Sequence, residues 1–112
     1  MKDVVGRWFQ VWEAGAFERI PVTPDFTHTS PFGRTEGRDE YLRIVAANTG
    51  QFLGFSFEIH DEMYGDGRAC VRYTGRKGDF SLDVSEWFYG SDEGIEEIVS
   101  YYHLGDAAVY DN

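Results

Sequence analysis

The sequence predicts an α+β domain in which a curved antiparallel sheet is covered by helices. Two observations support this fold class. Apolar residues recur at helical spacing up to about residue 48, and they alternate with polar residues from residue 51 onward. The length of 112 residues matches one domain, since single domains commonly contain about 100–150 residues. We therefore expect one domain over residues 1–112.

The first helix is predicted over residues 2–14. Gly15 is a typical residue for ending a helix, and residues 17–20 can add one further turn before Pro21. The helical prediction rests on apolar side chains that share one face, namely Val4, Val5, Trp8, Val11 and Trp12.

A short strand is predicted over residues 26–30, where the side chains alternate, and we expect it at an edge of the sheet. A second long helix is predicted from Thr35 or Glu36 to about Asn48. Later apolar residues recur at every second position, which is typical of half-buried strands, and glycine-rich turns separate them. These predicted strands cover residues 53–60, 69–73, 80–89 and 98–104.

Composition argues against several kinds of partner. The chain has 20 acidic and 10 basic side chains, and its net charge of −10 makes nucleic acid or an anionic membrane surface a poor partner. A single cysteine, Cys70, can form no disulfide within the chain and no cysteine-based zinc site. No residue run resembles a signal peptide or a membrane span, so a cytoplasmic protein is expected.

Glu86 breaks the pattern of its predicted strand. The even positions around it are apolar (Phe80, Leu82, Val84 and Phe88), so its carboxyl group lies on the face that points to the core. Burial of an ionised carboxylate is costly without a partner or a cavity, and it raises the pKa of the group. The sequence therefore favours Glu86 as an acid or hydrogen-bond donor; the alternative is that it reaches water or pairs with an arginine.

His28 is the second candidate, because it shares a strand face with Phe26 and Ser30. Imidazole titrates near neutral pH and can act as a general base. The alternative is a buried histidine that only completes a hydrogen bond. Tyr102 and Ser100 share a face of the last predicted strand, so a phenol can enter the same interior, where a buried tyrosine usually just finds a hydrogen-bond partner.

The order of elements resembles the NTF2-like superfamily, in particular its SnoaL-like branch. The resemblance covers nearly the whole chain and implies a cone-shaped, bent sheet with a mixed edge, wrapped by three N-terminal helices around a deep pocket. It also implies a homodimer that pairs across the sheet. The segments that carry the resemblance are Trp8 to Gly15, Phe17-Glu18-Arg19-Ile20, Thr23-Pro24-Asp25-Phe26, residues 28–33, residues 36–41 and residues 98–102.

Within this superfamily the ketosteroid isomerases offer the sharpest comparison. Their pocket acid followed by x-Phe looks like Glu86-Trp87-Phe88, and their hairpin looks like the turn over residues 73–77. Their general-base aspartate falls at Ser30, however, and their first-helix tyrosine falls near Trp8. The resemblance therefore does not predict steroid isomerisation by that mechanism.

Two hypotheses follow. In the first, the protein is an isomerase, lyase or cyclase that needs no cofactor or metal and acts on a small, largely apolar, carbonyl-bearing molecule. Glu86 is then the acid or donor and His28 accepts the proton. In the second, the chain is a ligand-binding or dimerisation module without catalysis. Under either hypothesis the residues expected to line the pocket are Trp8, Ser30, Tyr41, Phe55, Phe57, Val71, Ile98, Ser100 and Tyr102.

Overall fold

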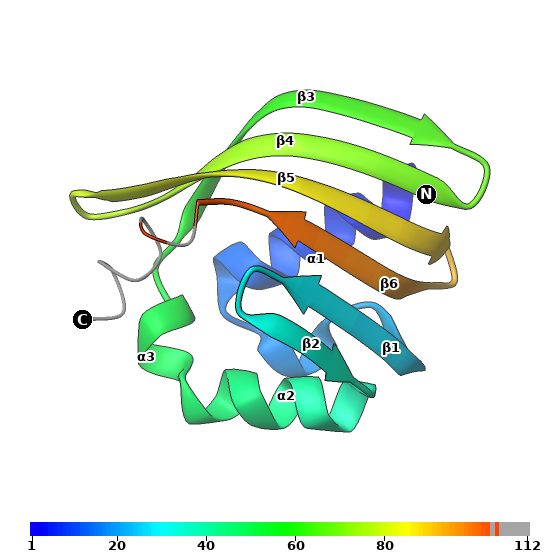
Figure 1. The fold of residues 1–112 in the computed structure, drawn as a ribbon, viewed down its shortest axis with the longest axis horizontal. Coiled ribbons are helices and arrows are strands. Elements are labelled where there is room, and N and C mark those ends of the chain that lie inside the picture. The colour runs from blue at the N-terminus through cyan, green and yellow to red at the C-terminus, as the bar shows by residue number, and fades with distance from the viewer. Residues whose placement is uncertain (104, 106–112) are drawn as a thin grey trace.

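A computed structural model describes residues 1–103 and residue 105, and Figure 1 shows how its elements are arranged. The predicted α+β class is confirmed: a six-stranded mixed sheet is accompanied by three α-helices and one 3-10 turn. In chain order the elements are α1 (Lys2–Ala14), η1 (Phe17–Arg19), β1 (Val22–Ser30), β2 (Gly33–Glu36), α2 (Arg38–Ala47), α3 (Thr49–Phe52), β3 (Ser56–Gly65), β4 (Arg68–Lys77), β5 (Phe80–Ser91) and β6 (Gly94–Tyr101). The expected cone shape stays a prediction.

The sheet has the order β2-β1-β6-β5-β4-β3. Neighbours from β3 to β6 are antiparallel, whereas β1 runs parallel to β6 and antiparallel to β2. The expectation that residues 26–30 form an edge strand was wrong, because β2 covers that side. β2 begins at Gly33 and is short, polar and mostly exposed, so no apolar alternation marks it, and the helix predicted from Thr35 or Glu36 begins only at Arg38.

β1 is also longer than the predicted strand, since it begins at Val22. Proline lacks an N–H for the ladder, and Pro24 lies inside the register shift between Val22 and Thr27, where no pairing with β6 needs that N–H. The proline is therefore accommodated within the strand.

The chain between α2 and β4 departs most from expectation. Residues 49–52 form α3, and β3 begins only at Ser56, so Leu53 lies outside the sheet and is 42% exposed. A register shift between Ile59 and Asp61 then changes which side chains face inward, and Ile59 is 42% exposed as well. Simple alternation cannot predict such a bulge, because one extra residue reverses the face of everything after it.

β6 begins at Gly94, four residues before the predicted start. The strand ends at Tyr101, so the predicted extension was wrong for Tyr102 and His103, and its last residue, Leu104, lies outside those that the structure describes. β4 continues through Gly75 to Lys77, where a turn was expected.

The core lies between the inner face of the sheet and the helices. Val71, Phe88 and Ile98, from β4, β5 and β6, are fully buried, and α1 adds Val4 and Val5. α1 packs against β3 and β6, whereas α2 packs against β1 and β2. α2 and α3 follow β2 in the chain, so only α1 and η1 precede the whole sheet. Within the described part of the chain, no helix has the length and apolar character needed to cross a membrane.

Candidate functional site

A cavity of about 570 Å³ lies between the inner face of the sheet and the helices. This volume falls within the range of roughly 300–1,000 Å³ that is typical of small-molecule pockets. Its wall is largely aromatic and aliphatic and includes side chains from α1, α2, β1, β4, β5 and the chain after β6. The expected site residues found in the lining are Glu86, His28, Trp8, Ser30, Tyr41, Phe55, Phe57, Ser100 and Tyr102.

The prediction of the pocket lining was wrong for two residues. Val71 and Ile98 point inward as expected, but each is 0% exposed within the core and neither belongs to the cavity wall. Alternation along a strand shows which face a side chain occupies. It does not show whether a helix covers that stretch of the face.

Four neighbouring strands bring polar side chains together on the cavity wall. His28 lies on β1, Ser100 on β6, Glu86 on β5 and Tyr73 on β4, and the sheet places these strands side by side. The register pairs Glu86 with Ser100 directly across β5 and β6. His28 pairs with Ile98 and Tyr73 with Val84, so each lies diagonally from this pair on the same inward face, within reach of its neighbour.

Hydrogen bonds join these four side chains into one chain of groups. The Nε2 atom of His28 lies 3.1 Å from Oγ of Ser100. The Ser100 hydroxyl donates to Oε2 of Glu86 at 2.6 Å, and the Tyr73 hydroxyl donates to Oε1 of Glu86 at 2.7 Å. Since the only hydrogen of the serine hydroxyl is engaged by Glu86, the bond from His28 requires a proton on Nε2. The remaining ring nitrogen of His28, Nδ1, is then an acceptor.

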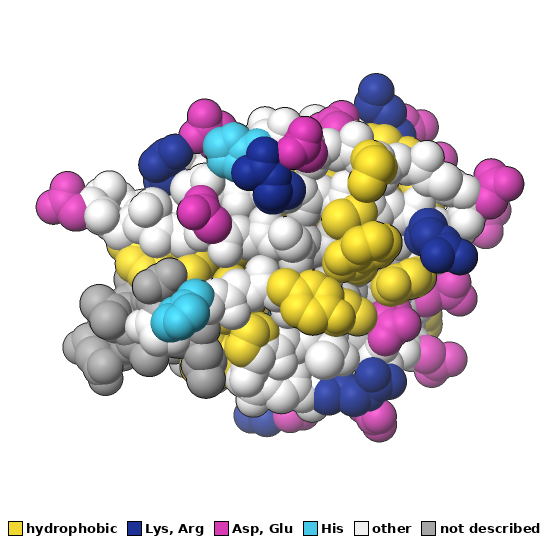
Figure 2. All heavy atoms as spheres, turned by 45° about the horizontal axis from the view of Figure 1, so that its top comes forward, with side chains coloured by type: hydrophobic (Ala, Val, Ile, Leu, Met, Phe, Trp, Pro, Cys, Tyr) yellow, Lys and Arg dark blue, Asp and Glu magenta, His cyan; other side chains and the backbone are white. Residues whose placement is uncertain are grey.

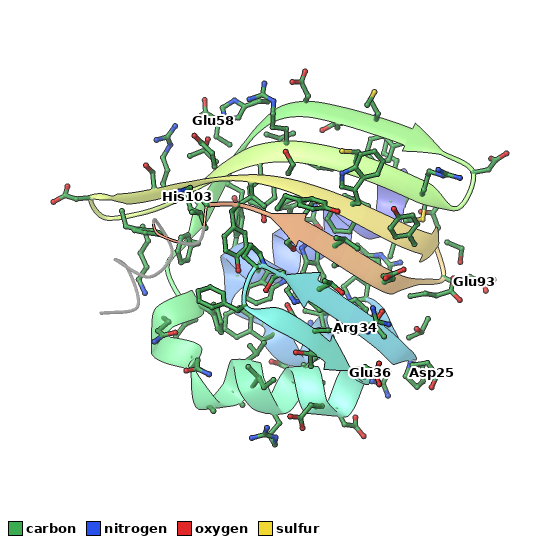
Figure 3. The ribbon with its side chains drawn as sticks, in the orientation of Figure 1. Asp25, Arg34, Glu36, Glu58, Glu93 and His103 are labelled. Carbon is green, nitrogen blue, oxygen red and sulfur yellow. The ribbon has the colours of Figure 1, made fainter. Side chains whose placement is uncertain are left out.

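Glu86 is a buried carboxyl group, 5% exposed, and no arginine or lysine pairs with it among the described residues. Burial raises its pKa, while the hydrogen bonds from Ser100 and Tyr73 act in the opposite direction. The charged side chains labelled in Figure 3, such as Glu58 and Glu93, lie at the periphery of the molecule instead. Glu86 is thus a proton-binding group set apart from the surface acids.

Burial lowers the pKa of His28 to about 4, so its ring is neutral at physiological pH. Its Nδ1 atom has no hydrogen-bond partner among the described residues. His28 itself lies in the wall of the cavity. A neutral imidazole, one of whose nitrogen atoms has no partner among the described residues, therefore lies on the cavity wall.

Tyr73 is the polar partner that the sequence analysis missed. It belongs to the inward row of β4, but alternation alone did not show that its hydroxyl reaches Glu86. The same wall contains further residues that were not expected there, among them Phe9, Trp12, Phe52, Leu82 and Val84. No three His, Cys, Asp or Glu side chains within residues 1–103 and 105 are grouped to hold a metal ion.

Comparison with known proteins agrees with this architecture. A family model described as "SnoaL-like domain" matches residues 5–98. No curated protein sequence matches the chain. Among solved structures, an NTF2-like protein of unknown function from Cytophaga hutchinsonii superposes with a TM-score of 0.81 at 16% identity, covering 96% of this chain and 93% of that one.

Two further solved structures share the fold. A putative ketosteroid isomerase from Kribbella flavida has a TM-score of 0.74 at 17% identity, covering 89% of this chain and 75% of its own. A putative polyketide cyclase from Silicibacter sp. TM1040 has a TM-score of 0.74 at 18% identity, covering 97% and 93%. Such identities establish a common fold only, whereas the family model spans most of the sequence. The chain therefore belongs to the SnoaL-like domain family, and it shares its fold with an NTF2-like protein.

Proposed function

We propose that the cavity binds a small, neutral, largely apolar carbonyl compound and that the protein transfers a proton on it, as an isomerase, lyase or cyclase without a cofactor. The observation that carries this proposal is the hydrogen-bonded chain from His28 through Ser100 to Glu86 on the cavity wall. Its free end is an imidazole nitrogen at the cavity, and its far end is a buried carboxyl group.

The chain can accept a proton without creating a charged ring. A C–H bond next to the ligand carbonyl breaks, and its proton moves to Nδ1 of His28 while the electron pair moves toward the carbonyl oxygen. His28 passes the proton on Nε2 to Ser100, which passes its own proton to Glu86. Glu86 is then neutral, His28 carries its proton on Nδ1, and the reverse sequence returns a proton to another position of the ligand.

The two perturbed pKa values support this relay. A histidine whose pKa is about 4 holds an extra proton poorly, so it acts better when it loses one proton as it gains another. Burial raises the pKa of Glu86, which makes this carboxyl group a better final acceptor than a surface acid. Tyr102, which lines the cavity beside this chain, is proposed to orient the ligand. The isomerase and cyclase names of the similar structures are compatible with such chemistry.

Hydrogen–deuterium exchange into 2-tetralone, a small apolar ketone, tests the proposal. We expect the protein to accelerate this exchange in heavy water, as followed by proton NMR. His28→Ala and Ser100→Ala should each lower the catalysed rate by about 10²–10⁴-fold, the usual contribution of a positioned proton-transfer group.

The matched control is Ser85→Ala, which removes a hydroxyl from the opposite face of β5. The control should retain the wild-type rate. Equal rates in wild type, His28→Ala and Ser100→Ala would contradict the relay. Failure of 2-tetralone to bind wild type would contradict the proposed class of ligand.

The second function, a dimerisation module, is favoured by the outer face of the sheet. Register places Met63, Cys70, Trp87 and Val99 in one row across β3 to β6, and Tyr101 lies beside it. Met63 is 67% exposed and Tyr101 60% exposed. Figure 2 shows hydrophobic side chains gathered on this side of the molecule. We propose that a second copy of the chain covers this row, since exposed apolar patches of this kind mark interaction surfaces.

Sedimentation velocity checks the proposed homodimer. Wild type should sediment as a dimer, and Trp87→Glu or Met63→Glu should sediment as a monomer, because each puts a buried charge into the interface. A monomeric wild type at micromolar concentration would contradict the proposal. The cytoplasmic location stays a prediction.

A further inference from the structure

The indole nitrogen of Trp12 is a buried hydrogen-bond donor without an acceptor. Trp12 lies on α1, and its Nε1 atom is shielded from solvent and has no hydrogen-bond partner among the residues that the structure describes. Buried side-chain donors nearly always find a partner, because an unpaired one loses its hydrogen bonds to water without replacement. The indole N–H therefore lacks an acceptor atom that a ligand can supply.

Trp12 belongs to the wall of the cavity that also contains His28. Its ring centroid lies 5.5 Å from that of Trp8, and the ring of Tyr41 lies 6.3 Å from Trp8. The ring of His28 comes next, 5.2 Å from Tyr41. Two aromatic rings thus lie between the indole of Trp12 and the imidazole of His28, so a ligand that contacts both groups extends along this wall.

Phe52 is the least firmly held of the rings that pack against Trp12. These rings are Trp8, Phe17 and Phe52, with centroids 5.5, 4.8 and 5.5 Å from the indole. Trp8 and Phe17 are buried core residues. Phe52 is only partly buried, lines the cavity and ends α3, a four-residue helix in which no residue is buried. A rotation of Phe52 can therefore give a ligand access to the indole nitrogen while the core stays in place.

The acceptor that suits this donor belongs to a neutral group. One neutral N–H cannot offset the cost of bringing a charged group into an apolar wall. Arg34 also lines the cavity, but its guanidinium group donates to Glu36 at 3.2 Å and lies 3.8 Å from Glu97, so carboxylates already compensate its charge. The oxygen atom of a ketone, a hydroxyl group or an ether meets the requirement at Trp12.

We propose that Trp12 is a specificity-determining residue whose Nε1–H donates a hydrogen bond to a second, neutral oxygen atom of the ligand, at the end opposite the reacting carbonyl group. Phe52 turns aside as this oxygen enters. The inference rests on the proposed function, which places the first carbonyl group near His28, and it deepens that function by naming the ligands as apolar molecules with two separated oxygen atoms. A molecule with a single carbonyl group leaves Trp12 unpaired and binds more weakly.

A matched pair of ligands tests this contact. The compound trans-decalin-2,6-dione has a ketone at each end, and trans-2-decalone lacks the second one. In calorimetric titrations wild type should bind the dione more tightly than the decalone. In Trp12→Phe, which keeps an aromatic ring, the ratio of the two affinities should fall by roughly threefold to tenfold, as expected for the loss of one hydrogen bond. The control Trp87→Phe also loses an indole N–H, but from outside the cavity lining, and should keep the wild-type ratio.

The indole N–H signal of Trp12 provides a second measurement, which does not depend on the folding of a variant. The chain has three tryptophans, so the assigned ¹H–¹⁵N NMR spectrum of wild type contains three indole signals. The dione should move the Trp12 signal further downfield than the decalone does, because the N–H gains an acceptor. Equal movement with both compounds overturns the inference, and this result is expected if the π face of Phe17 already holds the N–H.

The possible outcomes separate this inference from the proposed function. An affinity ratio that is unchanged in Trp12→Phe overturns the role of Trp12, whatever the exchange experiment with 2-tetralone gives. A ratio that depends on Trp12, in a protein that catalyses no exchange, supports the second contact and overturns the proton transfer. Failure of both decalin compounds to bind wild type overturns the inference together with the proposed class of ligand. Unfolding midpoints show whether each variant is folded.

Discussion

Between pH 6.5 and pH 4, the free energy of unfolding of the wild type is expected to fall by about 3 kcal/mol more than that of His28→Gln. Unfolded histidine has a pKa of 6.5, and in the folded protein burial lowers the pKa of His28 to about 4. A difference of one unit between the pKa values of the folded and unfolded states changes the free energy of unfolding by about 1.4 kcal/mol. The difference between 6.5 and about 4 therefore corresponds to about 3 kcal/mol.

The sign follows from proton binding. Between the two pKa values the unfolded chain binds a proton at His28 and the folded chain does not, so acid favours unfolding. The stabilisation is complete above pH 6.5 and is lost as the pH falls toward about 4. Glutamine cannot titrate but can still donate to Ser100, so this variant removes the linkage and keeps a hydrogen bond.

Urea unfolding at pH 6.5 and pH 4 measures the effect. The titration of the carboxyl groups, Glu86 included, is present in both proteins, so comparing the two variants cancels most of it. Parallel losses of stability in wild type and His28→Gln would contradict the neutral, buried ring. NMR titration of the His28 ring provides a direct measurement of the pKa.

Gly90→Ala is expected to destabilise the protein by about 3 kcal/mol or more, the range of substitutions that clash with the backbone in a disfavoured conformation. Gly90 has a φ of +144° at the register shift between β5 and β6. A Cβ atom there would overlap the carbonyl oxygen of Gly94 and lie 2.9 Å from the nitrogen of Glu96. These backbone atoms cannot turn away as a side chain can.

Thermal and urea unfolding measure this loss. Gly78→Ala is the matched control, because Gly78 also has a positive φ, +58°, but a Cβ atom there would meet nothing within 4 Å. The control should cost about 1–2 kcal/mol, from the left-handed conformation alone. A Gly90→Ala variant no less stable than Gly78→Ala would show that the bulge can rearrange.

Local periodicity predicted most of the fold. The helix over residues 2–14 and the inward rows of β4 and β5 follow from apolar spacing and agree with the structure. β2 could not be predicted in this way, because a short polar strand has no apolar signal. The bulge after Ile59 and the central place of β1 depend on pairing between distant segments, which spacing along one strand does not contain.

The same reasoning predicted only part of the candidate site. Glu86 and His28 could be singled out, because each is a titratable group on an apolar face. Ser100 was expected at the wall, but its hydrogen bonds to both candidates depend on β1, β6 and β5 being neighbours.

The parallel pairing of β1 with β6 also determines when the hydrogen-bonded chain from His28 to Glu86 can form during folding. The bond between His28 and Ser100 joins residues that are 72 positions apart in the chain. Contacts at such separation form late in folding, because a long loop must close first. During synthesis β1 is made early, whereas its parallel neighbour β6 is the last strand to be made. A nascent chain that has not reached β6 can therefore contain its helices and His28 and still lack Ser100, the group that connects His28 to Glu86.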